Sequence, residues 1–339
     1  MKELSVVGID LAKSVFHVHG TDETEKVCVR RKLNRSSLLK FFATLKPCLV
    51  GMEACGGSHY WARELVKQGH EVRLIPPQYV KPYVKTNKSD AIDAEAICEA
   101  VTRPTMRYVD IKSEDQQAIL LIHRDREGLV RDRTALINRI RATLGEFGLA
   151  VPTGPRNLHK WFEQRYSEAE SRLPVITAQQ VHRMMDRLKF IESEVADLDR
   201  QIELQGQRDE TVKRLEEIPG VGRLTASALV ATVGRAQSFK SGRQFSAWLG
   251  LVPRQHSTGG KSRLIGISKR GDAYLRRMLI HGARAVLRHM NPRRPVTAWL
   301  RQLQTRCHRN TVIVALANKL ARIVWALLTK GERYQEVTA

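Results

Sequence analysis

The chain has 339 residues, 42% of them hydrophobic and 27% charged, which is the composition of a globular protein with room for two or three domains. Lys and Arg number 57 against 35 Asp and Glu, and the resulting net charge of +22 predicts a polyanionic partner, most commonly nucleic acid. A membrane surface is the weaker alternative, because neither a basic amphipathic anchor nor a lipidation signal is evident.

The first third of the chain alternates strands and helices. Strands are predicted at residues 4–10, 15–20, 26–32, 48–53 and 71–75, where short apolar runs are bounded by polar breaks. Helices are predicted at residues 36–45, 59–68 and 90–101. Three strands followed by alternating helix and strand predict an α/β fold with a mixed sheet.

The middle of the chain is predicted to be helical from residue 113 to residue 147, until residues 151–155 break the pattern. Beyond the break, apolar residues recur at alternating three- and four-residue steps, as in a coiled-coil seam. The members of this seam are Val181, Met184, Leu188, Ile191, Val195, Leu198 and Ile202. We favour a self-association or arm-like element, and the alternative is one helix packed on its own domain.

The last domain is predicted to start near Leu215. Ile218-Pro-Gly-Val-Gly222, followed by an apolar helix, resembles a helix-hairpin-helix turn whose backbone N–H groups can hold a phosphate. A tight turn between two helices explains the same residues nearly as well. Residues 240–310 contain 16 Lys or Arg and one acid, Asp272, so this stretch carries +15 of the net charge and is the predicted nucleic-acid surface.

The location of the protein is predicted from three features. The five cysteines are scattered without a CxxC pair, which argues against a disulfide framework and a zinc site. Glu3 and Asp10 interrupt the first apolar stretch, which does not fit a signal peptide. Residues 312–328 are apolar but include Lys319 and Arg322, so a buried amphipathic helix is expected there. We expect a cytoplasmic protein without a membrane partner.

Four acids of the first domain form a candidate metal site. Asp10 and Glu53 each close a predicted strand, and Asp90 and Asp93 lie three residues apart on one face of a predicted helix. Like charges held together need a cation, and oxygen-only ligands select Mg²⁺ or Mn²⁺, which can activate a nucleophile and stabilise a leaving oxygen on a phosphodiester. Singly, Asp90 could be a helix cap and Asp10 a turn residue. The combination points to a site, because acids are unexpected at the ends of apolar core strands, where burying an unpaired acid is costly.

Three motifs carry a family resemblance. They are Gly8-Ile-Asp10-Leu-Ala-Lys13, Glu53-Ala-Cys-Gly-Gly57 and Lys88-Ser-Asp90-Ala-Ile-Asp93-Ala. They resemble the motifs of a RuvC-like domain with the RNase H fold, in the version found in the DEDD transposases of insertion sequence family one-ten. The resemblance implies that Asp10, Glu53, Asp90 and Asp93 are catalytic ligands of Mg²⁺.

A serine-containing block lies in the basic stretch. Trp248-Leu-Gly-Leu-Val-Pro-Arg-Gln-His-Ser257-Thr-Gly-Gly-Lys261 is followed by Gly266-Ile-Ser-Lys-Arg-Gly-Asp272. From chemistry alone this is a flexible loop that grips phosphate, since glycines allow close approach and cations balance charge. The block is similar to the C-terminal transposase signature of the same family, in its eleven-eleven subgroup. That similarity implies a nucleophilic serine at Ser257, with Thr258 as the alternative. The expected nucleic-acid contacts are Arg254, His256, Lys261, Arg263, Lys269, Arg270, Arg276 and Arg277.

The resemblance covers almost the whole chain and implies its organisation. We expect a RuvC-like catalytic domain at residues 1–110, a helical linker and coiled-coil arm at 111–214, a mainly helical transposase domain at 215–330 and a tail at 331–339. The implied function is excision and insertion of a mobile element by Mg²⁺-dependent cleavage and rejoining through a serine. The implied partners are donor and target double-stranded DNA, a guide non-coding RNA, and further copies of the chain in a dimer or tetramer.

Two rival functions remain at the level of sequence. A Holliday-junction resolvase or structure-specific nuclease would use the four acids alone, and a non-catalytic nucleic-acid scaffold would use neither the acids nor the serine. The serine block in so basic a domain argues against both.

Overall fold

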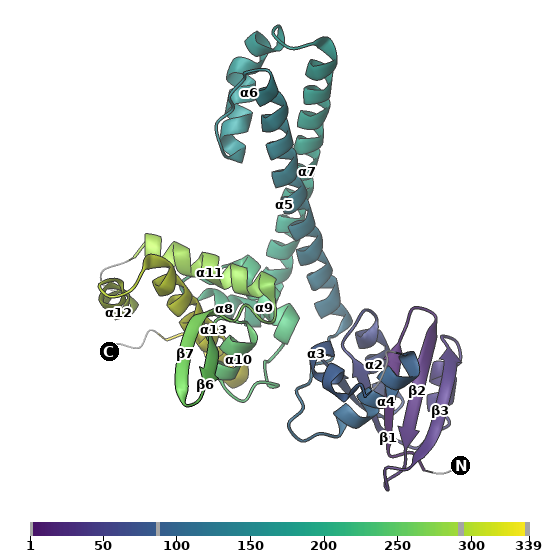
Figure 1. The fold of residues 1–339 in the computed structure, drawn as a ribbon. Helices are drawn as coiled ribbons and strands as arrows, with labels where there is room; N and C mark the ends of the chain where they lie inside the picture. The colour runs from purple at the N-terminus through teal and green to yellow at the C-terminus, as the bar shows by residue number, and fades with distance from the viewer. Residues whose placement is uncertain (1–2, 86–88, 291–294, 336–339) are drawn as a thin grey trace. The chain divides into compact units, whose positions relative to one another are not determined.

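The structure is a computed structural model that describes residues 3–85, 89–290 and 295–335. Lys88, the first residue of the third motif, and residues 336–339 of the tail lie outside this part. The chain forms two compact units, which are described separately (Figure 1). The first unit comprises Met1–Gln116 with Thr232–Phe245, and the second comprises Gln117–Ala231 with Ser246–Ala339.

The first unit is built on a five-stranded mixed sheet with the strand order β3-β2-β1-β4-β5. The strands are β1 (Val6–Leu11), β2 (Val15–Thr21), β3 (Val27–Asn34), β4 (Leu49–Glu53) and β5 (Glu71–Ile75). β1, β2 and β3 pair antiparallel, whereas β1, β4 and β5 pair parallel. The expected mixed α/β architecture is therefore confirmed for this part of the chain.

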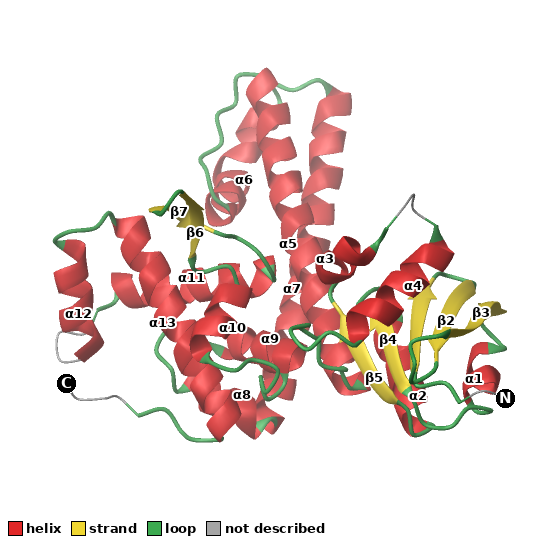
Figure 2. Cartoon of the chain, turned by 60° about the horizontal axis from the view of Figure 1, so that its bottom comes forward, coloured by secondary structure: helices red, strands yellow, loops and turns green. Residues whose placement is uncertain are grey.

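Helices lie on both faces of this sheet (Figure 2). They are α1 (Leu38–Phe42), α2 (Ser58–Lys67), α3 (Pro77–Val80) with the 3-10 turn η1 (Lys81–Tyr83), and α4 (Asp90–Val101). Strand residues alternate between the faces. Val7 and Ile9 join the core that contains Leu38 and Trp61 of α1 and α2. The other face packs against α4 through Ile97 and neighbouring apolar residues.

Two glycines allow α4 to lie close to the sheet. A Cβ atom on Gly8 would stand 2.3 Å from the carbonyl oxygen of Ala94, and one on Gly51 would stand 2.9 Å from Val101. Each glycine precedes an acid, Asp10 or Glu53, by two residues on its strand. The period of two puts each glycine on the same face as its acid. The two glycines thus allow α4 to pack closely on the sheet, and Asp10 and Glu53 follow them at the ends of β1 and β4.

In the second unit, α5 (Glu114–Glu146), α6 (Pro155–Glu170) and α7 (Val175–Arg208) pack together (Figure 1). The predicted seam residues Val181, Leu188, Ile191 and Val195 are buried in this cluster, against residues of α5 and α6 such as Leu144. The interpretation of the seam as a self-association surface is therefore wrong for these residues. They pack within their own unit, because the helical break at residues 151–155 lets the chain fold back and bury them.

The remainder of the second unit is mainly helical. Its helices are α8 (Glu210–Glu216), α11 (Ala273–Arg288), α12 (Pro295–Gln304), α13 (Arg309–Lys330) and most of α9 (Arg223–Val233), while α10 (Gly242–Trp248) begins in the first unit and ends in the second. The Ile218–Gly222 turn lies between α8 and α9, and its Gly220 (φ 89°) touches the backbone of Gly282 in α11. Gly220 therefore serves helix packing, as a tight turn requires. Asp272, the lone acid of the basic stretch, accepts a hydrogen bond from the N–H of Leu275 and caps α11.

One helix among the described residues, α13, is long and apolar enough to cross a membrane by length and composition alone. Half of its most apolar window is buried within the protein, including Val312, Leu316 and Leu320. The expected buried amphipathic helix at this position is confirmed. A core helix passes the same length and composition test.

A buried polar cluster joins three helices of the second unit. His123 of α5 is 2% exposed, its Nδ1 lies 3.0 Å from the Tyr274 hydroxyl of α11, and its Nε2 lies 3.2 Å from the Ser227 hydroxyl of α9. Burial lowers the pKa of His123 to about 4, and the charge of Arg126 adds to this effect. The imidazole is therefore neutral at physiological pH and acts as a hydrogen-bonded packing element.

Candidate active site and nucleic-acid interface

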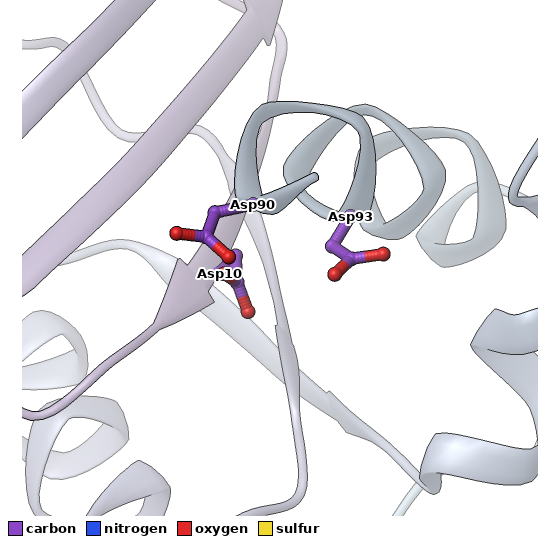
Figure 3. A group of neighbouring side chains, drawn as sticks. All are labelled: Asp10, Asp90 and Asp93. Carbon is purple, nitrogen blue, oxygen red and sulfur yellow. The ribbon is translucent and has the colours of Figure 1, made fainter. Parts of the chain in front are cut away.

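Three of the four predicted acids meet beside the sheet (Figure 3). Asp10 lies on β1, and Asp90 and Asp93 lie in the first turn of α4. One carboxylate oxygen of each lies within 4.8 Å of the others. Ser89 caps α4 by accepting from the N–H of Ile92, so Asp90 is the first helical residue and the cap is the residue before it. The three-residue spacing then turns Asp90 and Asp93 to one side.

The electrostatics of Asp10 reflect this crowding. Its pKa is raised from 3.8 to about 6, first by burial and then by the charges of Asp93, Asp90 and Glu53, while His17 opposes the rise. Within the described residues the close group comprises the three aspartates, and Glu53 acts on Asp10 through its charge. An oxygen-only donor set whose members repel one another fits a hard divalent cation.

His17 was not singled out by the sequence. It is the cross-strand partner of Asp10 in the β1–β2 pair, and its Nε2 lies 3.6 Å from Oδ2 of Asp90. Only the antiparallel register places it there, because the pairing of Asp10 with His17 cannot be deduced before the turn between the two strands is known. The signal available beforehand was a His-x-His pair on one face of a predicted strand.

Ser257 lies on a β-hairpin, which replaces the expected flexible loop. β6 (Pro253–Thr258) and β7 (Lys261–Ile267) pair antiparallel around Gly259 and Gly260, both with positive φ. Two consecutive residues with positive φ make the tight turn that matches the twist of a hairpin. The side chain of Gln255 donates from Nε2 to the Ser257 hydroxyl at 2.7 Å. The serine is thus exposed on a defined strand, with one polar neighbour on its own strand.

The two faces of this hairpin differ in chemistry. Cross-strand partners share a face, and Ser257 shares its face with Gln255 and with Leu264, the partner of Gln255. The opposite face carries all four of the expected nucleic-acid contacts that lie on the hairpin. They are Arg254, His256, Lys261 and Arg263, together with Thr258. These bases therefore flank the serine along the chain but do not share its face.

The four remaining expected contacts lie around the start of α11. Arg276 donates to the carbonyl oxygens of Leu249 at 3.0 Å and Arg270 at 2.8 Å, which ties two loops together. Arg277 donates to Glu127 of α5 at 2.6 Å. Lys269 and Arg270 are exposed. The structure thus gives Arg276 a packing role that the sequence did not predict, pairs the exposed Arg277 with Glu127, and leaves the hairpin and the Lys269–Arg270 pair exposed.

A mixed α/β unit with a carboxylate cluster, followed by a strongly basic helical part, has the organisation of an enzyme that acts on nucleic acid. Comparison with known proteins narrows this class. The DEDD transposase model of the IS110 family, described as "Transposase", matches residues 7–148, and the model described as "Transposase IS116/IS110/IS902 family" matches residues 212–297.

Full-length relatives agree with these matches. The chain is 53% identical to the "Probable family 20 transposase" of Pseudomonas aeruginosa, over 98% of this chain and 99% of the relative. It is 42% identical to the transposase for insertion sequence element IS1328 of Yersinia enterocolitica, over 98% of each. It is also 42% identical to the transposase for insertion sequence element IS1111A of Coxiella burnetii, over 99% of this chain and 92% of the relative. The chain belongs to the IS110/IS116/IS902 family of transposases, and its substrate is DNA.

Proposed function

We propose that this transposase excises and inserts its mobile element by Mg²⁺-dependent strand cleavage and rejoining through Ser257. The observation that carries the proposal is the convergence of Asp10, Asp90 and Asp93 within 4.8 Å beside the sheet. The strand order β3-β2-β1-β4-β5, with three antiparallel strands followed by two parallel ones, supports a RuvC-like RNase H fold. In such a fold the acids at the ends of the first and fourth strands, here Asp10 and Glu53, face the same edge.

Asp10, Asp90, Asp93 and Glu53 are the proposed ligands of Mg²⁺ or Mn²⁺. When bound, the cation supplies Lewis-acid stabilisation of negative charge on phosphate oxygens. The side chains themselves set the conditions for binding. The raised pKa of Asp10 records repulsion that a cation relieves, so protonation and cation binding compete at this carboxylate.

Ser257 is the proposed nucleophile. Its hydroxyl oxygen attacks a DNA phosphorus and loses its proton to solvent, a serine–phosphorus bond forms, and a phosphorus–deoxyribose oxygen bond breaks as that oxygen takes up a proton. The reverse attack by a deoxyribose hydroxyl rejoins the strand and frees the serine, so no ATP is consumed. The hydrogen bond from Gln255 orients the Ser257 hydroxyl and stabilises charge on its oxygen. Thr258, on the opposite face of the hairpin, is the minor alternative.

The proposed macromolecular partners follow from charge and from the reaction. Residues 240–310 carry a net charge of +15, and the exposed cations of the β6–β7 hairpin supply contacts to phosphates of donor and target duplexes. A guide non-coding RNA is proposed by family resemblance, and the same charge surplus accommodates it. Joining two duplexes requires a dimer or tetramer with closed symmetry. The division into a catalytic part (1–110), an arm (111–214), a transposase domain (215–330) and a tail (331–339) is proposed on the same resemblance.

The test is a denaturant-resistant protein–DNA adduct. The full chain is incubated with Mg²⁺, junction DNA of its own element and RNA transcribed from the flank of that element, and the wild type is compared with Ser257→Ala, Thr258→Ala and Asp10→Ala. We expect an adduct in the wild type and in Thr258→Ala, and none in Ser257→Ala. Cleavage without an adduct that Ser257→Ala leaves unchanged would mean that the chain is a metal-dependent nuclease of the resolvase type.

A further inference from the structure

A pocket of about 300 Å³ opens beside the three aspartates, between β2, β3 and the start of α4. Its walls include His17 and His19 of β2, Arg30, Arg31 and Lys32 of β3, and Glu95 of α4. It adjoins the carboxylates directly, because the Nε2 atom of His17 lies 3.6 Å from Asp90. All of these residues belong to the first unit.

The sheet register explains why basic side chains gather there. His17 pairs with Lys32, and His19 pairs with Arg30 across the β2–β3 ladder. Cross-strand partners share a face, and His17 is also the partner of Asp10 in β1. The four basic residues therefore share the face of the sheet on which α4 lies. α4 covers β1 there, which leaves the β2 and β3 positions as the wall of the pocket.

The charge of the pocket is positive. Among the described residues that line the pocket, the one acid is Glu95, which lies 3.5 Å from Arg30, 4.0 Å from Lys85 and 3.9 Å from the buried His19. This carboxylate thus faces two cations, Arg30 and Lys85, whereas burial lowers the pKa of His19 and disfavours its charged form. Arg30 and Lys32 are exposed, so their charged ends reach solvent on an edge strand. Cations in excess at a solvent-open pocket attract an anion, and paired Arg and Lys donors suit the oxygens of a phosphate.

We propose that this pocket is a phosphate subsite for the DNA strand that is cut. It holds the phosphodiester next to the one at the carboxylates, and so fixes the register in which the strand crosses the acidic cluster. The proposal rests on the proposed role of Asp10, Asp90 and Asp93. Arg30 and Lys32 are positioning residues that hold the strand, and His17 is the wall between the subsite and the aspartates. DNA is favoured over RNA because the subsite adjoins the carboxylates that serve DNA cleavage.

The subsite would offset the repulsion between the three aspartates and the DNA strand. Three aspartates repel a polyanionic strand, and this repulsion is strongest before a cation is bound. A neighbouring group of cations on the same sheet face offsets that repulsion and binds the strand one phosphate away. The acidic cluster then receives a phosphodiester whose position is already set, which is how positioning contacts raise a rate.

The test measures how DNA binding depends on salt. Full-length wild type is compared with Arg30→Gln/Lys32→Gln, using a fluorescent duplex of the element's own end and, separately, an RNA strand of its flank. Arg35→Gln is the matched control: it removes the same kind of charge one residue beyond β3, but Arg35 does not line the pocket, and its guanidinium lies over the ring of Trp61, 4.9 Å from its centroid. We expect the slope of log affinity against log salt for DNA to become shallower by about one unit in the double variant. No such change is expected in Arg35→Gln.

A second measurement locates the contact on the strand. Single phosphates of the duplex are replaced in turn by neutral methylphosphonates. We expect one replacement, next to the cleavage position, to weaken wild-type binding and to have no added effect on the double variant. Equal slope changes in Arg35→Gln, or a replacement effect that survives in the double variant, would overturn the subsite. A change for RNA but not for DNA would overturn its assignment to the cut strand.

These measurements need no cleavage, so they separate the subsite from the proposed chemistry. If no protein–DNA adduct formed but the double variant still reduced the salt dependence of DNA binding, the serine mechanism would be wrong and the subsite would stand. Circular dichroism checks the fold of each variant. If the double variant does not fold, Lys32→Gln alone replaces it, because Lys32 is exposed on an edge strand. The slope of log affinity against log salt is then expected to become shallower by a smaller amount.

Discussion

The acidic site of the first unit and the serine of the second unit are held in different ways. Asp10, Asp90 and Asp93 come from a core strand and a capped helix, and glycines that admit α4 to the sheet fix their approach. Ser257 stands on an exposed two-stranded hairpin whose β6 residues are all exposed. Stiff elements suit charged ligands that must meet within a few ångströms, whereas an exposed hairpin suits a nucleophile that must reach a bulky duplex. The difference predicts that changes to the first site cost stability or metal binding, and that changes to the second cost reaction steps alone.

The largest expected effect is that of Asp10→Asn. We expect loss of strand transfer on the order of 10³-fold or more, because a ligand of the proposed cation is removed. The same variant should melt at a higher temperature than the wild type without divalent cations, since one of several repelling charges is gone. Added Mg²⁺ should stabilise the wild type and not the variant. A metal-free variant that melts below the wild type in differential scanning calorimetry would contradict the crowding of the acids.

Gly8→Ala tests whether helix seating decides the acidic site. The added Cβ would stand 2.3 Å from the carbonyl oxygen of Ala94, so α4 must move away from β1. We expect a loss of about 3 kcal/mol in the free energy of unfolding, together with loss of strand transfer. Gly128→Ala is the matched control, because nothing lies within 4 Å of its added Cβ in helix α5. It should gain about 0.5–1 kcal/mol in urea unfolding. Equal results for the two variants would contradict the seating argument.

Asp10 of the first unit and His123 of the second should contribute to stability with opposite pH dependences when no divalent cation is present. The pKa of Asp10 is raised to about 6 in the folded chain, so its contribution to stability is present below about pH 4 and is lost as pH rises through 6. The pKa of His123 is lowered to about 4, so its contribution is present above about pH 6.5 and is lost as pH falls through 4. Amide hydrogen exchange in each unit, corrected for its intrinsic pH dependence, should show these two contributions as differences between the wild type and the variants of Asp10 and His123.

Two variants assign these trends. Asp10→Asn should remove the Asp10 contribution from the first unit alone, where the buried His19 and His70, whose pKa values are lowered, still titrate. His123→Gln should remove the His123 contribution from the second unit alone. His123→Gln can retain one hydrogen bond of the cluster with Tyr274 and Ser227, and it has no group that titrates. If both units followed one common curve in every variant, the assignment of the trends to these two groups would be wrong.

The smallest expected effect separates the two faces of the hairpin. Gln255→Ala removes the hydrogen bond to Ser257 and should slow adduct formation about tenfold without weakening DNA binding. Arg254→Gln, on the opposite face, should weaken DNA binding and reduce its salt dependence, with little change in adduct formation once DNA saturates the protein. Adduct kinetics at saturating DNA and a binding titration measure the two effects. Identical behaviour of the two variants would mean that the faces do not divide these roles.

Much of the first unit could be predicted from the sequence because its signals are local. Alternating apolar residues mark its strands, and the predicted ranges 4–10, 48–53 and 71–75 agree with β1, β4 and β5 to within a few residues. Three of the four acids were brought together as expected, because strand ends and a three-residue helical spacing fix their directions. The hairpin was missed because β6, with the sequence Pro-Arg-Gln-His-Ser-Thr, has no apolar alternation. Its one local signal was the Gly259-Gly260 pair between two short runs.

The sequence by itself determined the class of enzyme, the α/β plan and the acids that define its candidate site, since each depends on neighbours in the chain. The tertiary structure decided which surfaces are used. It buried the α7 seam against α5 and α6, turned Arg276 to packing, paired the exposed Arg277 with Glu127, and set the hairpin cations on the face opposite Ser257. It also placed His17, Lys32 and Arg30 beside the aspartates. These outcomes depend on strand register and on contacts between distant segments, which periodicity along the chain does not encode.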